Sequence, residues 1–244
     1  MDRANAFVRC LAYLDRQLET RGRPGSLEYP LRMAVAISRQ AGTDADNIAE
    51  KLAEYLQVNG PADAQPWTVL DKELMARVLE DHHLPARLAE FLPEDEINAI
   101  RDAVDEILGL HPPSWLIIHE SAQTILRLAE LGNVVLVGRG AAVITRRMPN
   151  VVRVRLVGSI EQRLARVQQS ERLSRDEALG FIRRTDRGRA RYVKKYFGED
   201  VADELLYDLT INTDILSRNQ IVHMMGDLVL DRILSVESEL KQAA

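Results

Sequence analysis

The residues best suited to chemistry in this chain lie in a short polar turn, residues 38–47, with the sequence SRQAGTDADN. An apolar run at 34–37 precedes the turn, which contains Gly42. Ile48, Leu52 and Leu56 then recur at the spacing of an amphipathic helix. A strand, a tight turn and a helix in this order present backbone N–H groups and the positive end of the helix dipole to an anion. The stretch therefore predicts an anion site at the turn.

The turn departs from the motif that binds polyphosphates, which is G-x-x-x-x-G-K-[ST] with a lysine on the outer phosphates. Asp44, Ala45, Asp46 and Asn47 occupy the positions where the second glycine, the lysine and the hydroxyl are expected. An alternative interpretation is purely structural. Asn47 and Glu50 have the spacing of a capping box, and the two acids suit the start of any helix.

A second candidate follows the apolar run at 134–137, which leads directly into Gly138-Arg139-Gly140. Ligands of open parallel sheets bind at the carboxyl ends of the strands. Arg139 is therefore well placed for an anionic group.

Residues 174–197 form the most strongly charged segment of the chain. Guanidinium groups suit bidentate phosphate binding, although a run of charges is often only a solvated helix face. The cations of this segment are Arg183, Arg184, Arg187, Arg189, Arg191, Lys194 and Lys195, opposed by Asp186.

The elements that must position these residues alternate along the chain. Strands are expected at 34–37, near 69, at 134–137, at 151–157 and at 208–212. Helices are expected at 114–131, 160–169, 174–197 and 217–241, and over most of 72–110. This order predicts an α/β fold with a parallel sheet covered on both faces. Residues 2–20 predict an additional amphipathic helix, which either packs on the same subunit or pairs two copies in a homodimer, and residues 21–30 form a linker.

Composition narrows the class of protein. The chain has 244 residues, a net charge of −5 and one cysteine, Cys10, so a disulfide framework and a cysteine-rich zinc site are excluded. No apolar run reaches the roughly 18 residues of a membrane span, and the N-terminus has no signal-peptide core. We expect a cytoplasmic protein that does not associate with membranes.

Four blocks of sequence resemble the cytidylate kinase-like family, a branch of the P-loop nucleoside monophosphate kinases. They cover roughly residues 33–235 and read AISRQAGTDADNIAEKLAEYL, LDKELM, VVLVGRGA and IRRTDRGRARYVKKYF with YDLTINTDILS. The resemblance implies a P-loop-type sheet in a domain at 31–244, with a helical acceptor-binding insert at 71–112 and an arginine-rich helical lid at 174–200.

The resemblance further implies transfer of a phosphoryl group from ATP, with Mg²⁺, to a nucleoside monophosphate such as CMP. Such enzymes align the two substrates, neutralise charge with arginines and exclude water by closing a lid. The resemblance implies that the donor is bound by Ser38, Arg39, Gly42, Thr43 and Asp46, and the acceptor by Asp71, Lys72 and Arg139. It also implies catalytic roles for Arg187, Arg189 and Arg191, with Asp186 orienting one of them. Secondary roles are implied for Arg163 and Arg166.

The family pattern S-G-G-R is here Thr43-Asp44-Ala45-Asp46, so an acid replaces the expected arginine. Like charges about 4 Å apart repel by roughly 1 to 4 kcal/mol between water and a protein surface, and side chains at 44 and 45 are expected to obstruct phosphate. Three hypotheses remain open. The arginine lid favours an active kinase, the two acids favour a catalytically impaired nucleotide or anion sensor, and the basic cluster at 183–195 would also suit a nucleic-acid contact, which is the least favoured of the three.

Overall fold

The computed structural model describes residues 32–61, 66–71, 115–138 and 140–243. Within them, five parallel strands form one sheet in the order β2-β3-β1-β4-β5. The strands are β1 (Ala34–Arg39), β2 (Thr68–Leu70), β3 (Val134–Val137), β4 (Val151–Val157) and β5 (Leu209–Asn212). Strand β1 lies at the centre, where Ala34 is in register with both Val134 and Val151. The predicted α/β fold and its parallel sheet are confirmed.

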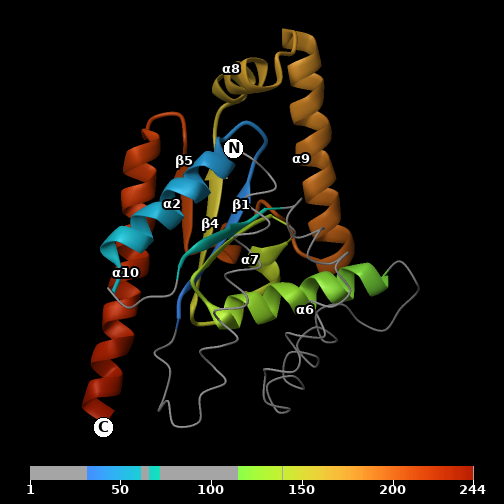
Figure 1. The fold of residues 1–244 in the computed structure, drawn as a ribbon. Coiled ribbons are helices and arrows are strands. Elements are labelled where there is room, and N and C mark those ends of the chain that lie inside the picture. Colours follow the sequence, from blue (N-terminus) through green and yellow to red (C-terminus); the bar gives the residue numbers. More distant parts are fainter. Residues whose placement is uncertain (1–31, 62–65, 72–114, 139, 244) are drawn as a thin grey trace.

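Helices cover both faces of the sheet (Figure 1). One face packs against α2 (Ala45–Asn59) and α10 (Arg218–Ala243), and the other packs against α6 (Trp115–Leu131), α7 (Ala141–Ile144) and the C-terminal part of α9 (Arg175–Phe197). Alternation along β1 explains this division, because Val35 and Ile37 face α2 while Ala34 and Ala36 face α6. The sequence did not predict α7 or the short 3-10 helix η1 (Glu204–Leu206).

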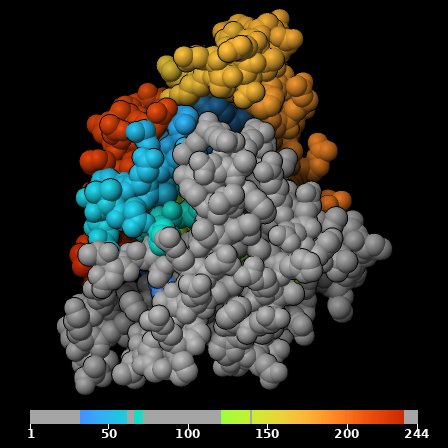
Figure 2. All heavy atoms as spheres, in the orientation of Figure 1, coloured from blue at the N-terminus to red at the C-terminus, as the bar shows by residue number. Residues whose placement is uncertain are grey.

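Helix α8 (Ile160–Glu171) and the N-terminal part of α9 form a separate apolar cluster at the carboxyl edge of the sheet. Leu164 and Val167 of α8 pack with Ala178 and Ile182 of α9 and with Ala41, the second residue after β1. Figure 2 shows these two helices at one end of the molecule. The arginine-rich segment is therefore packed against the turn that follows β1.

The helix boundaries follow local signals at α9 and α10. Ser174 and Glu177 form a capping box at the start of α9, and Gly198 ends that helix in a left-handed conformation. At α10, Ser217 accepts a hydrogen bond from the backbone N–H of Gln220. The predicted helices 174–197 and 217–241 are therefore confirmed. The predicted helices at 2–20 and within 72–110, and the linker at 21–30, lie outside the described residues.

Candidate functional site

The turn between β1 and α2 comprises residues 40–44 and contains two left-handed residues. Gly42 has φ +79°, and a Cβ atom there would lie 2.6 Å from the carbonyl oxygen of Arg163 in α8. Asp44 has φ 63°, which is uncommon for a residue with a side chain. Glycine is therefore required at 42 by the close approach of α8.

The start of α2 differs from the sequence prediction. The helix begins at Ala45 with Asp44 as its N-cap, so the predicted capping box of Asn47 and Glu50 is wrong. Asn47 lies inside the first turn, and its side-chain amide donates to the carboxylate of Asp44 at 2.6 Å. Asp44 makes no side-chain capping hydrogen bond, so it leaves the first-turn N–H groups of α2 without a side-chain cap.

The sequence predicted that the side chain at 45 would obstruct the turn, and the structure shows that it does not. Ala45 is buried against the sheet, with 6% of its surface exposed. The carboxylate of Asp44 is paired with Arg218 of α10, whose Nε donates to it at 2.7 Å. One of the two acids in the turn therefore has its charge balanced within the protein.

Asp186 and Arg163 hold the turn against the arginine-rich helix. One carboxylate oxygen of Asp186 accepts from the backbone N–H of Ala41 at 2.7 Å, and the other accepts from Arg163 Nη1 at 2.6 Å. The same Nη1 donates to the carbonyl of Ala41 at 3.1 Å. The hydrogen bonds of Asp186 thus orient Arg163 of α8, rather than Arg187, Arg189 or Arg191 as predicted. With 7% of its surface exposed, Arg163 is placed to support the turn.

Arg166 and Thr43 also make contacts that shape the turn. Arg166 donates to the carbonyl of Thr213 at 2.6 Å and to that of Gly42 at 3.4 Å. The hydroxyl of Thr43 donates to the carbonyl of Gln40 at 2.9 Å, and the side chain is buried. The Thr43 hydroxyl therefore points into the turn.

Two adjoining cavities surround this turn. The larger, of about 570 Å³, contains the start of α2 and is lined by Arg39, Arg166, Arg189 and Arg218 together with Asp44 and Asp46. The smaller, of about 370 Å³, lies between the turn and the loop after β5. Thr43, Asp44, Arg166 and Arg218 line both cavities, so the two are continuous at these side chains.

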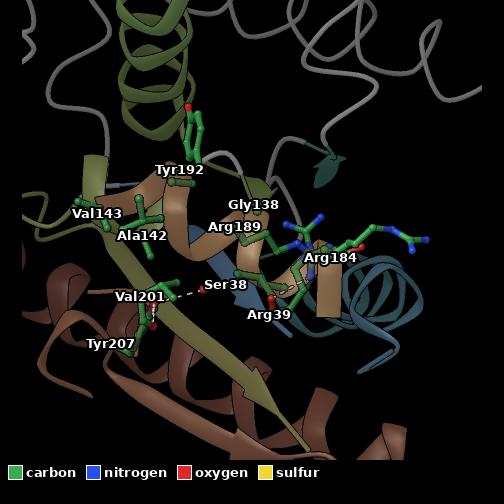
Figure 3. Close-up of a pocket in the computed structure, with 16 residues that line it drawn as sticks. Ser38, Arg39, Gly138, Ala142, Val143, Arg184, Arg189, Tyr192, Val201 and Tyr207 are labelled. Atoms are coloured by element: carbon green, nitrogen blue, oxygen red, sulfur yellow. Dashed lines mark hydrogen bonds between the residues drawn. The ribbon is translucent and has the colours of Figure 1, made fainter. Parts of the chain in front are cut away.

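A third cavity, of about 450 Å³, lies on the other side of Arg39, between the ends of β1 and β3 and helices α7 and α9. Figure 3 shows Arg39 and Arg189 side by side in it, with Arg184 extending away from them. Arg39 and Arg189 also line the cavity around the turn. These two arginines therefore stand at the junction of the two spaces.

The two arginines depend on each other and on Gly138. Arg189 Nη1 donates to the carbonyl of Arg39 at 3.0 Å. Gly138 has φ +86°, and a Cβ atom there would lie 1.8 Å from Arg39 Nη1, so any larger residue would displace the guanidinium. Burial lowers the pKa of Arg39, against the opposing charges of Asp46 and Asp71. Burial and then the charge of Arg39 lower the pKa of Arg189 to about 10, so Arg189 remains a cation at neutral pH.

Comparison with known proteins identifies the family. A model of the cytidylate kinase-like family matches residues 34–215, from β1 to the loop after β5. The chain belongs to this family. A protein named cytidylate kinase from Pyrobaculum neutrophilum is 28% identical over 198 residues, which are 81% of this chain and 92% of that protein. A cytidylate kinase from Pyrobaculum arsenaticum is likewise 28% identical, over 80% of this chain and 91% of its own.

Among solved structures, an uncharacterized protein from Eubacterium ventriosum superposes with a TM-score of 0.62 at 21% identity. The superposition covers 81% of this chain and 98% of that one. At this identity the likeness concerns the fold alone. The expected relationship to cytidylate kinase-like proteins is confirmed by the family match.

This cytidylate kinase-like chain also has a buried arginine that the sequence analysis missed. Arg155, on β4, is 9% exposed, and its Nη1 donates to the hydroxyl of Ser38 at 2.9 Å. Its guanidinium lies 5.5 Å from the ring centre of Tyr207. Ser38 and Tyr207 line the third cavity, so Arg155 lies directly behind its wall. The sequence did contain a signal that could have identified Arg155, namely a charged residue within the otherwise apolar strand predicted at 151–157.

The remaining predicted residues divide into three groups. Arg187 and Arg191 are exposed on α9, and Arg187 Nε donates to the carbonyl of Arg183 at 3.2 Å. Asp71 follows β2, and its charge partly offsets the lowering of the Arg39 pKa by burial. Lys72 and Arg139 lie outside the described residues.

The described part of the chain contains no helix long and apolar enough to cross a membrane. Within the same residues, no group of three or more histidine, cysteine or acidic side chains is arranged to hold a metal ion.

Proposed function

We propose that this protein transfers a phosphoryl group from ATP, with Mg²⁺, to a pyrimidine nucleoside monophosphate such as CMP. The observation that carries the proposal is that Arg39 and Arg189 line both the cavity around the turn and the cavity beside Gly138. A donor in one cavity and an acceptor in the other would meet at these two guanidinium groups. The two relatives named cytidylate kinase support this choice of reaction.

The donor would occupy the two continuous cavities around the turn. Its polyphosphate would lie over residues 40–44 and the uncapped start of α2, where backbone N–H groups and the helix dipole favour an anion. Its base would lie in the smaller cavity, whose apolar lining includes Ile48, Leu216 and Ile221.

The acids of the turn oppose polyphosphate less than their charges suggest. Asp44 is paired with Arg218. Burial lowers the pKa values of Arg39 and Arg189, and the charge of Asp46 partly offsets that lowering in both, so the Asp46 carboxylate is close enough to interact with two cations. Mg²⁺ is usually bound by substrate phosphates and one or two carboxylates, and the exposed carboxylate of Asp46 fits that role. Bound Mg²⁺ would neutralise phosphate charge.

The acceptor would occupy the cavity beside Gly138. Its phosphate would contact Arg39 and Arg189, with Ser38 and Tyr207 on the cavity wall. We assign Asp71, Lys72 and Arg139 to the same acceptor region as part of the proposal. Phosphoryl transfer needs alignment and charge neutralisation rather than covalent catalysis, and the partly buried guanidinium groups of Arg39 and Arg189 would provide both.

The first test is calorimetric titration of the protein with ATP, with and without Mg²⁺, followed by titration with CMP. Magnesium-dependent ATP binding, together with production of ADP and CDP in a coupled assay, is the expected result. Arg39→Gln should abolish turnover, whereas Arg172→Gln, which changes an exposed arginine beyond α8, should not. Binding of neither nucleotide would reject the proposal.

A second function is favoured by one observation, the presence of Asp44 and Asp46 in the donor cavity. If their charge prevents polyphosphate binding, the protein would bind a nucleoside monophosphate as a sensor without transferring phosphate. CMP binding in the absence of any ATP binding would distinguish this function from the first.

A further inference from the structure

Arg218, the first residue of α10, contacts the turn between β1 and α2 although it lies near the C-terminal end of the chain. Its Nε and Nη2 contact the same carboxylate oxygen of Asp44 at 2.7 and 2.5 Å. The two residues are 174 positions apart in the sequence. The turn itself has no cation between Gln40 and Asn47, so the contact brings in a positive charge that the turn does not have.

Asp44 and Arg218 both line the two cavities proposed for the donor. Asp44 caps α2 in a left-handed conformation, which costs a residue with a Cβ atom more than it costs glycine. Its carboxylate makes no capping hydrogen bond and is held by Asn47 and Arg218. The side chain therefore faces away from the helix and toward the cavities that it lines.

Arg218 differs from the other arginines around the turn. Arg39 and Arg189 also line the acceptor cavity, and Arg166 is held by hydrogen bonds to Thr213. The side chain of Arg218 is 42% exposed, lines both donor cavities, and contacts only Asp44 among the ion pairs of the described residues. It is therefore free to exchange one anionic partner for another.

We propose that Arg218 supplies the cationic contact to the donor polyphosphate that a lysine supplies in other phosphate loops. Asp44 is the internal anion that holds Arg218 in place while the site is empty, and phosphate oxygens replace it when the donor binds. This inference rests on the donor site of the proposed function. It adds α10 to the donor site and gives Asp44 the role of a competitor.

The test measures binding of two probes, Mg-ATP and inorganic tripolyphosphate, by titration calorimetry. Arg218→Gln should weaken the binding of both probes about tenfold or more. The substitution removes a hydrogen bond to a charged phosphate and leaves the carboxylate of Asp44 without its cation beside the phosphate. Arg218→Lys should retain most of the affinity because the charge remains. Asp44→Asn should raise the affinity for both probes several-fold. The loss of affinity caused by Arg218→Gln should be smaller when Asp44 is already replaced by Asn.

Arg175→Gln is the matched control, because Arg175 is an exposed first residue of a helix, as Arg218 is, and lines none of the three cavities. It should leave both affinities unchanged. Unchanged binding in Arg218→Gln would overturn the inference, and so would weaker binding in Asp44→Asn. Wild-type protein that binds neither probe would overturn it together with the proposed donor site. Arginine-dependent tripolyphosphate binding without phosphoryl transfer would support the inference and reject the proposed function.

Discussion

Asp186, in the middle of α9, accepts a 2.7 Å hydrogen bond from the backbone N–H of Ala41, the second residue after the central strand. The other oxygen of the same carboxylate accepts a hydrogen bond from Nη1 of Arg163, whose side chain is 8% exposed. One acidic side chain therefore connects the arginine-rich helix, α8 and the turn between β1 and α2.

Replacing Asp186 by Asn is expected to lower the free energy of unfolding by about 1 to 3 kcal/mol. The amide can still accept from Ala41, but it removes the carboxylate that forms an ion pair with the buried guanidinium of Arg163. Chemical denaturation measures the change. Asp176→Asn, in the exposed first turn of the same helix, should alter the free energy by no more than about 0.5 kcal/mol. Equal effects of the two changes would show that the contact of Asp186 adds no stability.

Gly138→Ala is expected to abolish acceptor binding. The added Cβ atom would lie 1.8 Å from Arg39 Nη1, and alanine is strained at φ +86°. Loss of CMP affinity by titration checks the prediction.

The control for this change is Gly198→Ala, at the C-terminal end of α9. Gly198 also has a left-handed backbone, at φ +73°, so alanine is strained there by about 1 to 2 kcal/mol, but nothing lies within 4 Å of a Cβ atom. This variant should therefore unfold at a lower denaturant concentration but bind CMP normally, because Gly198 lines none of the three cavities. If both variants keep CMP affinity, the position of Arg39 is not set by Gly138.

The sequence was sufficient to predict the sheet because its strands are apolar and each is followed by a helix. The boundaries of β3 and β4 match the predicted 134–137 and 151–157. The start of α2 was mispredicted because Asn47 and Glu50 have capping-box spacing, whereas the left-handed backbone of Asp44 starts the helix three residues earlier. Short helix α7, of four residues, is too brief to show a period.

The site was predicted less completely because its contacts join distant parts of the chain. The sequence analysis identified both the turn and the arginine-rich helix as candidate sites. The positions of these segments in the sequence do not reveal that Asp186 pairs with Arg163. In the same way, Asp44 was interpreted as a charge opposed to phosphate, since its partner Arg218 is far away in sequence. The roles proposed for Ser38, Arg39, Asp46 and Arg189 remain predictions.

Arg189→Ala is expected to lower kcat for CMP phosphorylation at least about tenfold and to change KM less, because a partly buried guanidinium at the junction of the proposed donor and acceptor cavities would act mainly on charge that develops during transfer. Steady-state kinetics with Mg-ATP and CMP measure both constants. Arg187→Ala is the matched comparison two residues earlier on the same helix, exposed and outside the cavities. A similar loss in the two variants would indicate a general effect of charge on α9.

Arg155→Met is expected to separate stability from binding. The guanidinium is buried, and among the described ion pairs none involves it, so its only compensation comes from Ser38 and Tyr207. Replacing a buried charge with an apolar side chain of similar length is often neutral or stabilising. The free energy of unfolding should therefore be unchanged or higher by up to about 2 kcal/mol. Affinity for CMP should fall, because the cavity loses a positive charge behind Ser38.

Arg153→Met, two residues earlier on β4, is the control with the opposite expectation. Arg153 donates to both carboxylate oxygens of Asp208, at 3.1 and 2.9 Å. Burial raises the pKa of Asp208, but the hydrogen bonds from Arg153 lower it, and the net shift is downward. The ion pair therefore contributes stability at neutral pH, and this stability is lost as Asp208 is protonated at acidic pH. Arg153→Met should lower the free energy of unfolding at pH 7, with a smaller loss at acidic pH, and should leave CMP binding intact. Destabilisation by Arg155→Met as large as that by Arg153→Met would show that Arg155 is held for the fold rather than for an anion.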